Sequence, residues 1–80
     1  MKLPRDVSGS ALVRGLGVLG YAATRQQGSH VRLTTEVRGE HHVTIPLHDP
    51  LKVGTLSAVL KSVAAHHGLT LAELLGQIRL

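Results

Sequence analysis

The fold is decided by the stretch RQQGSHVRL, residues 25–33. It reads as the end of one strand, a tight turn at Gly28 and Ser29, and the start of a second strand, because glycine and serine are turn residues. After the turn, apolar and polar residues alternate, which is the period of a strand with one buried face. Successive side chains of a strand point to opposite faces, so His30 and Arg32 are predicted to share the solvated face.

The neighbouring segments predict two further strands, one on each side of this second strand. Residues 21–25 form the first strand, residues 30–37 the second and residues 41–46 the third. In the third strand Val43 and Ile45 must point into the core, so His42 and Thr44 come out beside His30. Short turns join the three strands, which is typical of an antiparallel meander.

Helix signals lie before and after these strands. Ser8 is a favoured N-cap for a first helix, which is expected to end at Gly20. Gly54 or Thr55 is expected to cap a second helix, and Thr70 begins the capping box of a short third helix. The apolar faces of the second and third helices are Leu56, Val59, Leu60 and Val63, and Leu71, Leu74, Leu75 and Ile78. For the third helix, core packing is favoured over a docking stripe for a partner.

These elements predict a single α+β domain over residues 1–80. Its order is α-β-β-β-α, with a three-stranded antiparallel sheet and a short extra C-terminal helix. One sheet face packs on the helices and the other faces water. Double-stranded-RNA-binding domains share this order, and they recognise the shape and backbone of RNA.

The composition favours a polyanionic partner. Nine Lys and Arg residues against five Asp and Glu residues give a net charge of +4, and nucleic acid is the first candidate. Tyr21 is the only aromatic residue, so bases have no platform to stack on, and binding through backbone and shape is expected. The absence of cysteine excludes disulfides and thiolate zinc sites. Without a long apolar run or a signal peptide, the expected location is the cytosol, with no membrane partner.

Six histidines raise the question of a metal site, and their spacing argues against one. The adjacent pairs are His41-His42 on a strand and His66-His67 on a helix. Neighbouring side chains on a strand or a helix point in different directions, so neither pair can coordinate one ion. No metal, and no other cofactor, is expected. His66 and His67 are interpreted as last-turn residues that interact favourably with the helix dipole.

His30 has a chemical role available next to phosphate. RNA carries its own nucleophile, the 2′-hydroxyl, and cleavage by internal attack needs a base, an acid and positive charge at the phosphate. An imidazole suits both proton-transfer roles, because its unperturbed pKa of about 6.5 makes both forms accessible near neutrality. His30 is therefore the candidate catalytic residue. The alternative is an ordinary solvated histidine, which is also the favoured interpretation of His42.

Six further residues are candidates for binding the RNA backbone. Arg25, Arg32 and Lys52 would hold phosphate, while Gly28 and Ser29 would position the turn or bond a phosphate oxygen. His48 is added because its loop is expected at the same edge of the sheet.

Several motifs together resemble the HicA family, toxins of bacterial type II toxin–antitoxin systems. They are Lys2-Leu3-Pro4, Gly20-Tyr21, the turn at residues 25–30, Val43-Thr44-Ile45-Pro46, His48, and the helix start at residues 51–56. The resemblance runs from residue 1 to about residue 67. The chain departs from it in a glycine-rich first helix and in a longer segment after Gly68.

The resemblance implies a small double-stranded-RNA-binding-like fold that acts as an mRNA endoribonuclease with one catalytic histidine, here His30. It also implies that activity needs neither ribosome nor cofactor, and that a HicB-like antitoxin covers the active face. Two alternatives stay open: a non-catalytic double-stranded-RNA-binding module on the same fold, and a structural interaction protein without RNA affinity.

Overall fold

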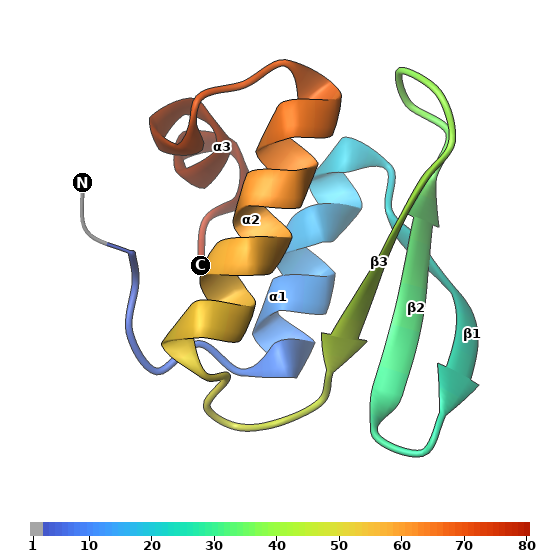
Figure 1. Cartoon of the computed structure of the whole chain (residues 1–80), viewed down its shortest axis with the longest axis vertical. Helices are drawn as coiled ribbons and strands as arrows, with labels where there is room; N and C mark the ends of the chain where they lie inside the picture. Colours follow the sequence, from blue (N-terminus) through green and yellow to red (C-terminus); the bar gives the residue numbers. More distant parts are fainter. Residues whose placement is uncertain (1–2) are drawn as a thin grey trace.

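Three strands form an antiparallel meander in the order β1–β2–β3 (Figure 1). In the computed structural model, which describes residues 3–80, β1 is Ala22–Gln27, β2 is His30–Thr35 and β3 is His41–Pro46. The predicted three-stranded antiparallel sheet is confirmed. Lys2 of the Lys2-Leu3-Pro4 motif lies outside the described residues.

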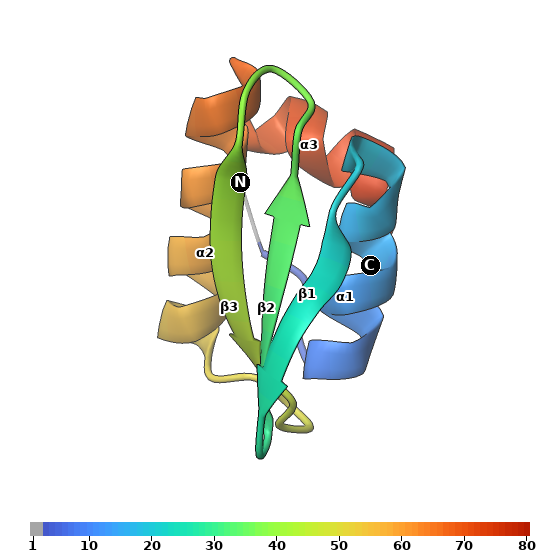
Figure 2. The same ribbon diagram turned by 90° about the vertical axis from the view of Figure 1, so that its right-hand side faces the viewer.

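Two helices cover one face of this sheet. Figure 2 shows α1 (Gly9–Leu16) and α2 (Val53–His67) behind the strands, while the face toward the viewer carries no helix of residues 3–80. A 3₁₀ turn, η1 (Gly17–Leu19), leads from α1 toward β1, and α3 (Leu71–Ile78) packs against α2 and η1. This arrangement confirms the predicted α+β class with a C-terminal helix. None of the helices in the described part of the chain is long and apolar enough to cross a membrane.

The core lies between the helices and the inward face of the sheet. Val31, Leu33 and Ile45 are buried at alternate positions of β2 and β3, which confirms the predicted strand faces. The apolar face predicted for α2 is buried at all four positions. On α3, Leu74 and Ile78 are buried, and the remaining two stripe residues pack partly buried against the same core. Core packing therefore accounts for the stripe.

The predicted N-caps of α1 and α3 are confirmed. Ser8 Oγ accepts a hydrogen bond from the Ala11 amide at 3.0 Å. At α3, Thr70 Oγ1 accepts from the Glu73 amide at 3.1 Å, and Glu73 Oε1 accepts from the Thr70 amide at 2.8 Å. These reciprocal bonds satisfy amide groups that a helix start otherwise leaves unpaired.

The predicted cap of α2 is wrong. The helix begins at Val53, after Lys52 as N-cap, and no side chain caps it. Leu51 is buried, and its amide donates to the Val7 carbonyl at 2.8 Å. These contacts fix the chain just before the helix. The helix therefore starts ahead of Gly54 and Thr55, the two residues predicted as its cap.

Other element ends differ by a few residues from the prediction. β2 ends at Thr35 because its hydroxyl donates to the Leu19 carbonyl at 2.9 Å and accepts from the Val37 amide at 3.1 Å. β1 starts at Ala22, since the Tyr21 amide donates to the Leu16 carbonyl at 3.4 Å. The first α-helix ends at Leu16, and Gly20, where it was expected to end, follows only after the 3₁₀ turn and has a left-handed φ of 83°.

Candidate active site

The uncovered face of the sheet carries a hollow of about 210 Å³. It is lined by Arg25, Gln27, His30, Arg32 and Thr44. The strand register explains this grouping, because Gln27 lies opposite His30, and Arg32 lies between Arg25 on β1 and Thr44 on β3. The hollow thus places one imidazole beside two guanidinium groups.

A β-bulge brings Arg25 to this face. Ala23 pairs with the inward-facing Leu33, and two residues later a regular strand would again point inward. The register shifts between Ala23 and Arg25, so that Arg25 pairs with the outward-facing Arg32. An extra residue in one strand of a pair re-aims the side chains that follow it, which is how bulges often serve functional sites.

The two arginines are opposite each other without a carboxylate between them. Within residues 3–80 the only contact of salt-bridge length joins Glu40 and His42, which is charged only when protonated, so no carboxylate of the described residues neutralises Arg25 or Arg32. Like charges directly opposite on a sheet are destabilising. An anion bound between the two guanidinium groups would relieve this repulsion.

His48 lies beside His30. Their ring centroids are 6.3 Å apart and the rings are inclined at 70°. The loop that carries His48 is fixed by two backbone hydrogen bonds: the Leu47 amide donates to the Ser29 carbonyl at 2.6 Å, and the Gly9 amide donates to the His48 carbonyl at 2.8 Å. The loop therefore lies at the edge of the sheet that was predicted for it.

The remaining candidates, Gly28, Ser29, His48 and Lys52, do not line the hollow. Gly28 adopts a positive φ of 55° in the turn, and its carbonyl accepts from Gln26 Nε2 at 3.1 Å. Ser29 is exposed in the same turn. Lys52 is exposed at the start of α2, beyond the His48 loop.

His42 joins a polar ladder farther along the same face. Its Nδ1 lies 2.7 Å from Thr34 Oγ1, its Nε2 lies 3.0 Å from Glu40 Oε1, and Thr34 Oγ1 is 2.9 Å from Thr24 Oγ1. The sequence placed His42 on this face but gave no sign of the ladder, which depends on the strand register.

The other end of the sheet holds a second histidine cluster, around Tyr21. The Tyr21 hydroxyl lies 2.7 Å from His41 Nδ1 and 3.2 Å from His67 Nε2, so it donates to one imidazole and accepts from the other. The His66 ring stacks on His41 at 4.4 Å, and its Nε2 donates to the carbonyls of Val37 and Gly39, both at 3.0 Å.

Interaction with the helix dipole is therefore only part of the role of His66, and for His67 that interpretation is wrong. His66 holds the β2–β3 turn, and His67 is buried against Tyr21. Burial lowers the pKa of His67, and the nearby His66, His41 and Arg38 lower it further. A buried imidazole that resists protonation does not supply the positive charge that a helix dipole favours.

This cluster predicts that acid destabilises the protein. Burial, and then His66 and His42, also lower the pKa of His41, so His41 and His67 both have folded pKa values below the ordinary 6.5. Burial raises the pKa of Tyr21 to about 12, so the phenol stays neutral. The stabilising contribution of the two histidines is complete above pH ~6.5 and is lost as the pH falls through their folded pKa values, because the unfolded chain then binds more protons.

Thermal unfolding followed by circular dichroism between pH 8 and pH 5 checks this prediction. The midpoint should change little above pH ~7 and fall below pH ~6.5. His67→Gln, which cannot titrate there, should show a shallower fall. A midpoint that rises on acidification, or an equal slope in the variant, would contradict it.

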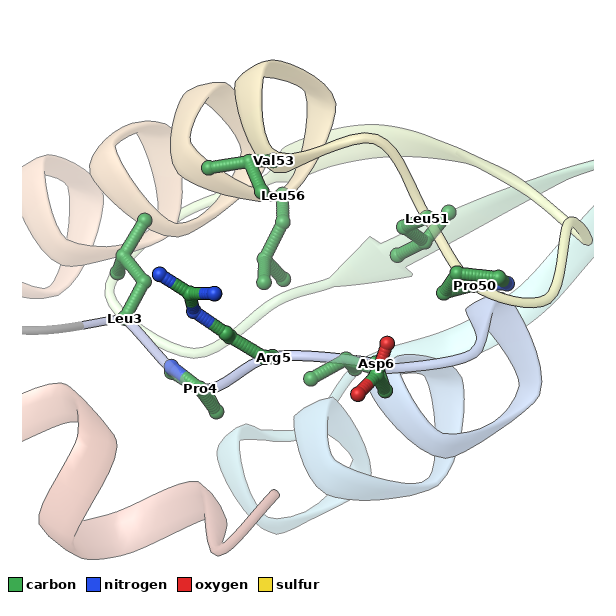
Figure 3. A pocket seen from close by; sticks show the side chains of 9 residues that line it. Leu3, Pro4, Arg5, Asp6, Pro50, Leu51, Val53 and Leu56 are labelled. Carbon is green, nitrogen blue, oxygen red and sulfur yellow. The ribbon is translucent and has the colours of Figure 1, made fainter.

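A larger hollow of about 480 Å³ lies between the segment before α1 and the start of α2 (Figure 3). Figure 3 shows mainly apolar side chains around it, with Arg5 and Asp6 as the charged members. It contains none of the predicted site residues. Within residues 3–80, no three histidine or carboxylate side chains are grouped so that they could hold a metal ion.

Comparison with known protein families gives one match. A family model described as HicA toxin of bacterial toxin-antitoxin matches residues 9–64. Searches of curated proteins and of solved structures gave no match. The matched residues include the turn before His30, both arginines of the hollow and the loop of His48. Because the match covers more than half of the chain and extends across all three strands, this chain belongs to the HicA toxin family of bacterial toxin–antitoxin systems.

Proposed function

We propose that this protein is a metal-independent mRNA endoribonuclease that uses His30 as its one catalytic base, and that it is the toxin partner of a HicB-like antitoxin. Family membership supports a toxin of an RNA-cleaving kind. The observation that carries the proposal further is the hollow in which His30 lies beside Arg25 and Arg32. We place its action in the cytoplasm, where mRNA is translated.

The two arginines supply what the reaction requires at the phosphate. In the transition state of internal attack, negative charge grows on the non-bridging phosphate oxygens, and pre-positioned cations stabilise it. Guanidinium groups suit this task because they stay charged and present several donors in a fixed plane. A phosphodiester between Arg25 and Arg32 would also relieve the repulsion between them.

His30 is exposed and open to a large substrate. An imidazole there can accept the proton of the 2′-hydroxyl, which becomes the attacking oxygen. Gly28 and Ser29 in the turn, His48 in its loop and Lys52 at the start of α2 would bind the RNA backbone on either side. The antitoxin would inhibit by covering the same uncovered sheet face.

The test is an assay that measures cleavage and binding together. Purified protein is incubated in EDTA with a long RNA that contains single-stranded and hairpin segments, and with the same sequence as DNA. We expect the protein to cleave the RNA and not the DNA. Its affinity for RNA should fall as the salt concentration rises. Salt-sensitive RNA binding without cleavage would replace the proposal with the non-catalytic RNA-binding module.

A further inference from the structure

We propose that His48 is the general acid of the cleavage reaction and forms an acid–base pair with His30, so that two histidines act where the family resemblance implies one. The inference rests on the proposed function and deepens it. When the 2′-oxygen attacks phosphorus, the bond from phosphorus to the 5′-oxygen breaks, and that oxygen needs a proton to leave. His30 cannot accept the first proton and supply the second at the same moment, so a second group is required.

His48 is the suitable proton donor near His30. Arginine side chains do not deprotonate in proteins, which excludes Arg25 and Arg32 as acids. Gln27 and Thr44, which complete the lining of the hollow, carry no readily transferable proton. His48 does not line the hollow, but its imidazole lies 6.3 Å from that of His30, centroid to centroid, and an imidazole can give a proton near neutral pH.

The separation of the two rings fits an in-line displacement. The attacking and leaving oxygens lie on opposite sides of phosphorus, and each must be within hydrogen-bond reach of its own catalytic group. The His30 and His48 rings are neighbours, with centroids 6.3 Å apart and planes inclined at 70°, and both residues are exposed, so one phosphodiester bound at this face can be within reach of both imidazoles.

Backbone contacts hold this pair in place. Ser29 directly precedes His30, Leu47 directly precedes His48, and the hydrogen bond of 2.6 Å joins these two preceding residues. The carbonyl of His48 itself is bound by the Gly9 amide. Positioning by the backbone, with the site on a strand end and a pinned loop, keeps the geometry productive.

The balanced step has two proton transfers. His30 takes the 2′-hydroxyl proton as the 2′-oxygen bonds to phosphorus, and His48 gives a proton to the 5′-oxygen as its bond to phosphorus breaks. The products are a 2′,3′-cyclic phosphate and a 5′-hydroxyl. Exchange of one proton with water resets each histidine.

A substrate that needs no acid tests the role of His48. When sulfur replaces the 5′-bridging oxygen at the cleavage site, the downstream fragment leaves as a thiolate. Thiols are far more acidic than alcohols (a cysteine thiol has a pKa of about 8.5), so protonation of the leaving group is dispensable. On ordinary RNA, His48→Ala and His48→Gln should be slower than wild type by roughly 10²- to 10⁴-fold. On the sulfur substrate both should approach the wild-type rate, while His30→Ala stays slow on both substrates.

His42→Ala is the matched control, since His42 is an exposed histidine on the same sheet face whose ring nitrogens contact Thr34 and Glu40 and not His30. It should cut both substrates at the wild-type rate. Full activity of the His48 variants on ordinary RNA would overturn the inference, and so would a defect that is equally large on the sulfur substrate. If wild type cuts neither substrate, the proposed function itself fails.

Discussion

Replacing His30 with alanine is expected to lower the rate of RNA cleavage by about 10²- to 10⁴-fold, the usual contribution of a general acid or base. The affinity for RNA should stay almost unchanged, because Arg25 and Arg32 remain to hold phosphate. Single-turnover cleavage and filter binding, measured on the same RNA, separate the two effects.

The structure also predicts that this variant folds normally. His30 is exposed, and its register with Gln27 and Pro46 in the sheet does not depend on its side chain. The thermal midpoint of His30→Ala should therefore match that of wild type. A His30→Ala protein that cleaves RNA at the wild-type rate would remove His30 from the mechanism.

Replacing Gly9 with alanine is expected to destabilise the protein by about 1–3 kcal/mol, the usual cost of overpacking. Gly9 opens α1 against the loop after β3. A β-carbon there would overlap the carbonyl oxygen of Pro46 and lie 2.9 Å from Leu47 Cα, and both are backbone atoms that cannot rotate away. Each kcal/mol should lower the thermal midpoint by about 4–8 °C in a domain of this size.

Activity should fall together with stability in this variant. The loop that must move is the one that carries His48, and the Gly9 amide is bonded to the His48 carbonyl. Gly17→Ala is the matched control, because a β-carbon there meets no atom within 4 Å and the backbone is helical. It should be neutral or stabilising by about 0.4–1 kcal/mol. Equal thermal midpoints for the Gly9 and Gly17 variants would show that a β-carbon at position 9 does not clash with the backbone of Pro46 and Leu47.

Much of the fold was predictable because local patterns and tertiary contacts agree. Alternation after Gly28 predicted which residues of β2 are buried, and the spacing of Leu56, Val59 and Leu60 predicted the buried face of α2. The Thr70 capping box is a local device, complete within four residues. The start of α2 was not predictable, since it depends on a hydrogen bond between Leu51 and Val7, distant in the sequence.

The candidate site was likewise predictable only where local patterns determine it. His30 and Arg32 share a face through strand alternation alone, which the sequence reveals. The position of Arg25 depends on a bulge that has no glycine or proline to announce it. The second cluster joins Tyr21 to His67, which are 46 residues apart, so no local pattern could have revealed it.

The chemistry of the new RNA ends tests the central claim most directly. Wild-type protein would cut a defined RNA in EDTA, and the ends would be identified by mass spectrometry. Attack by the 2′-hydroxyl at the His30 site predicts a 2′,3′-cyclic phosphate or its hydrolysis product on the upstream fragment, and a 5′-hydroxyl on the downstream fragment. A 3′-hydroxyl with a 5′-phosphate would show that water attacked instead, and would contradict the account.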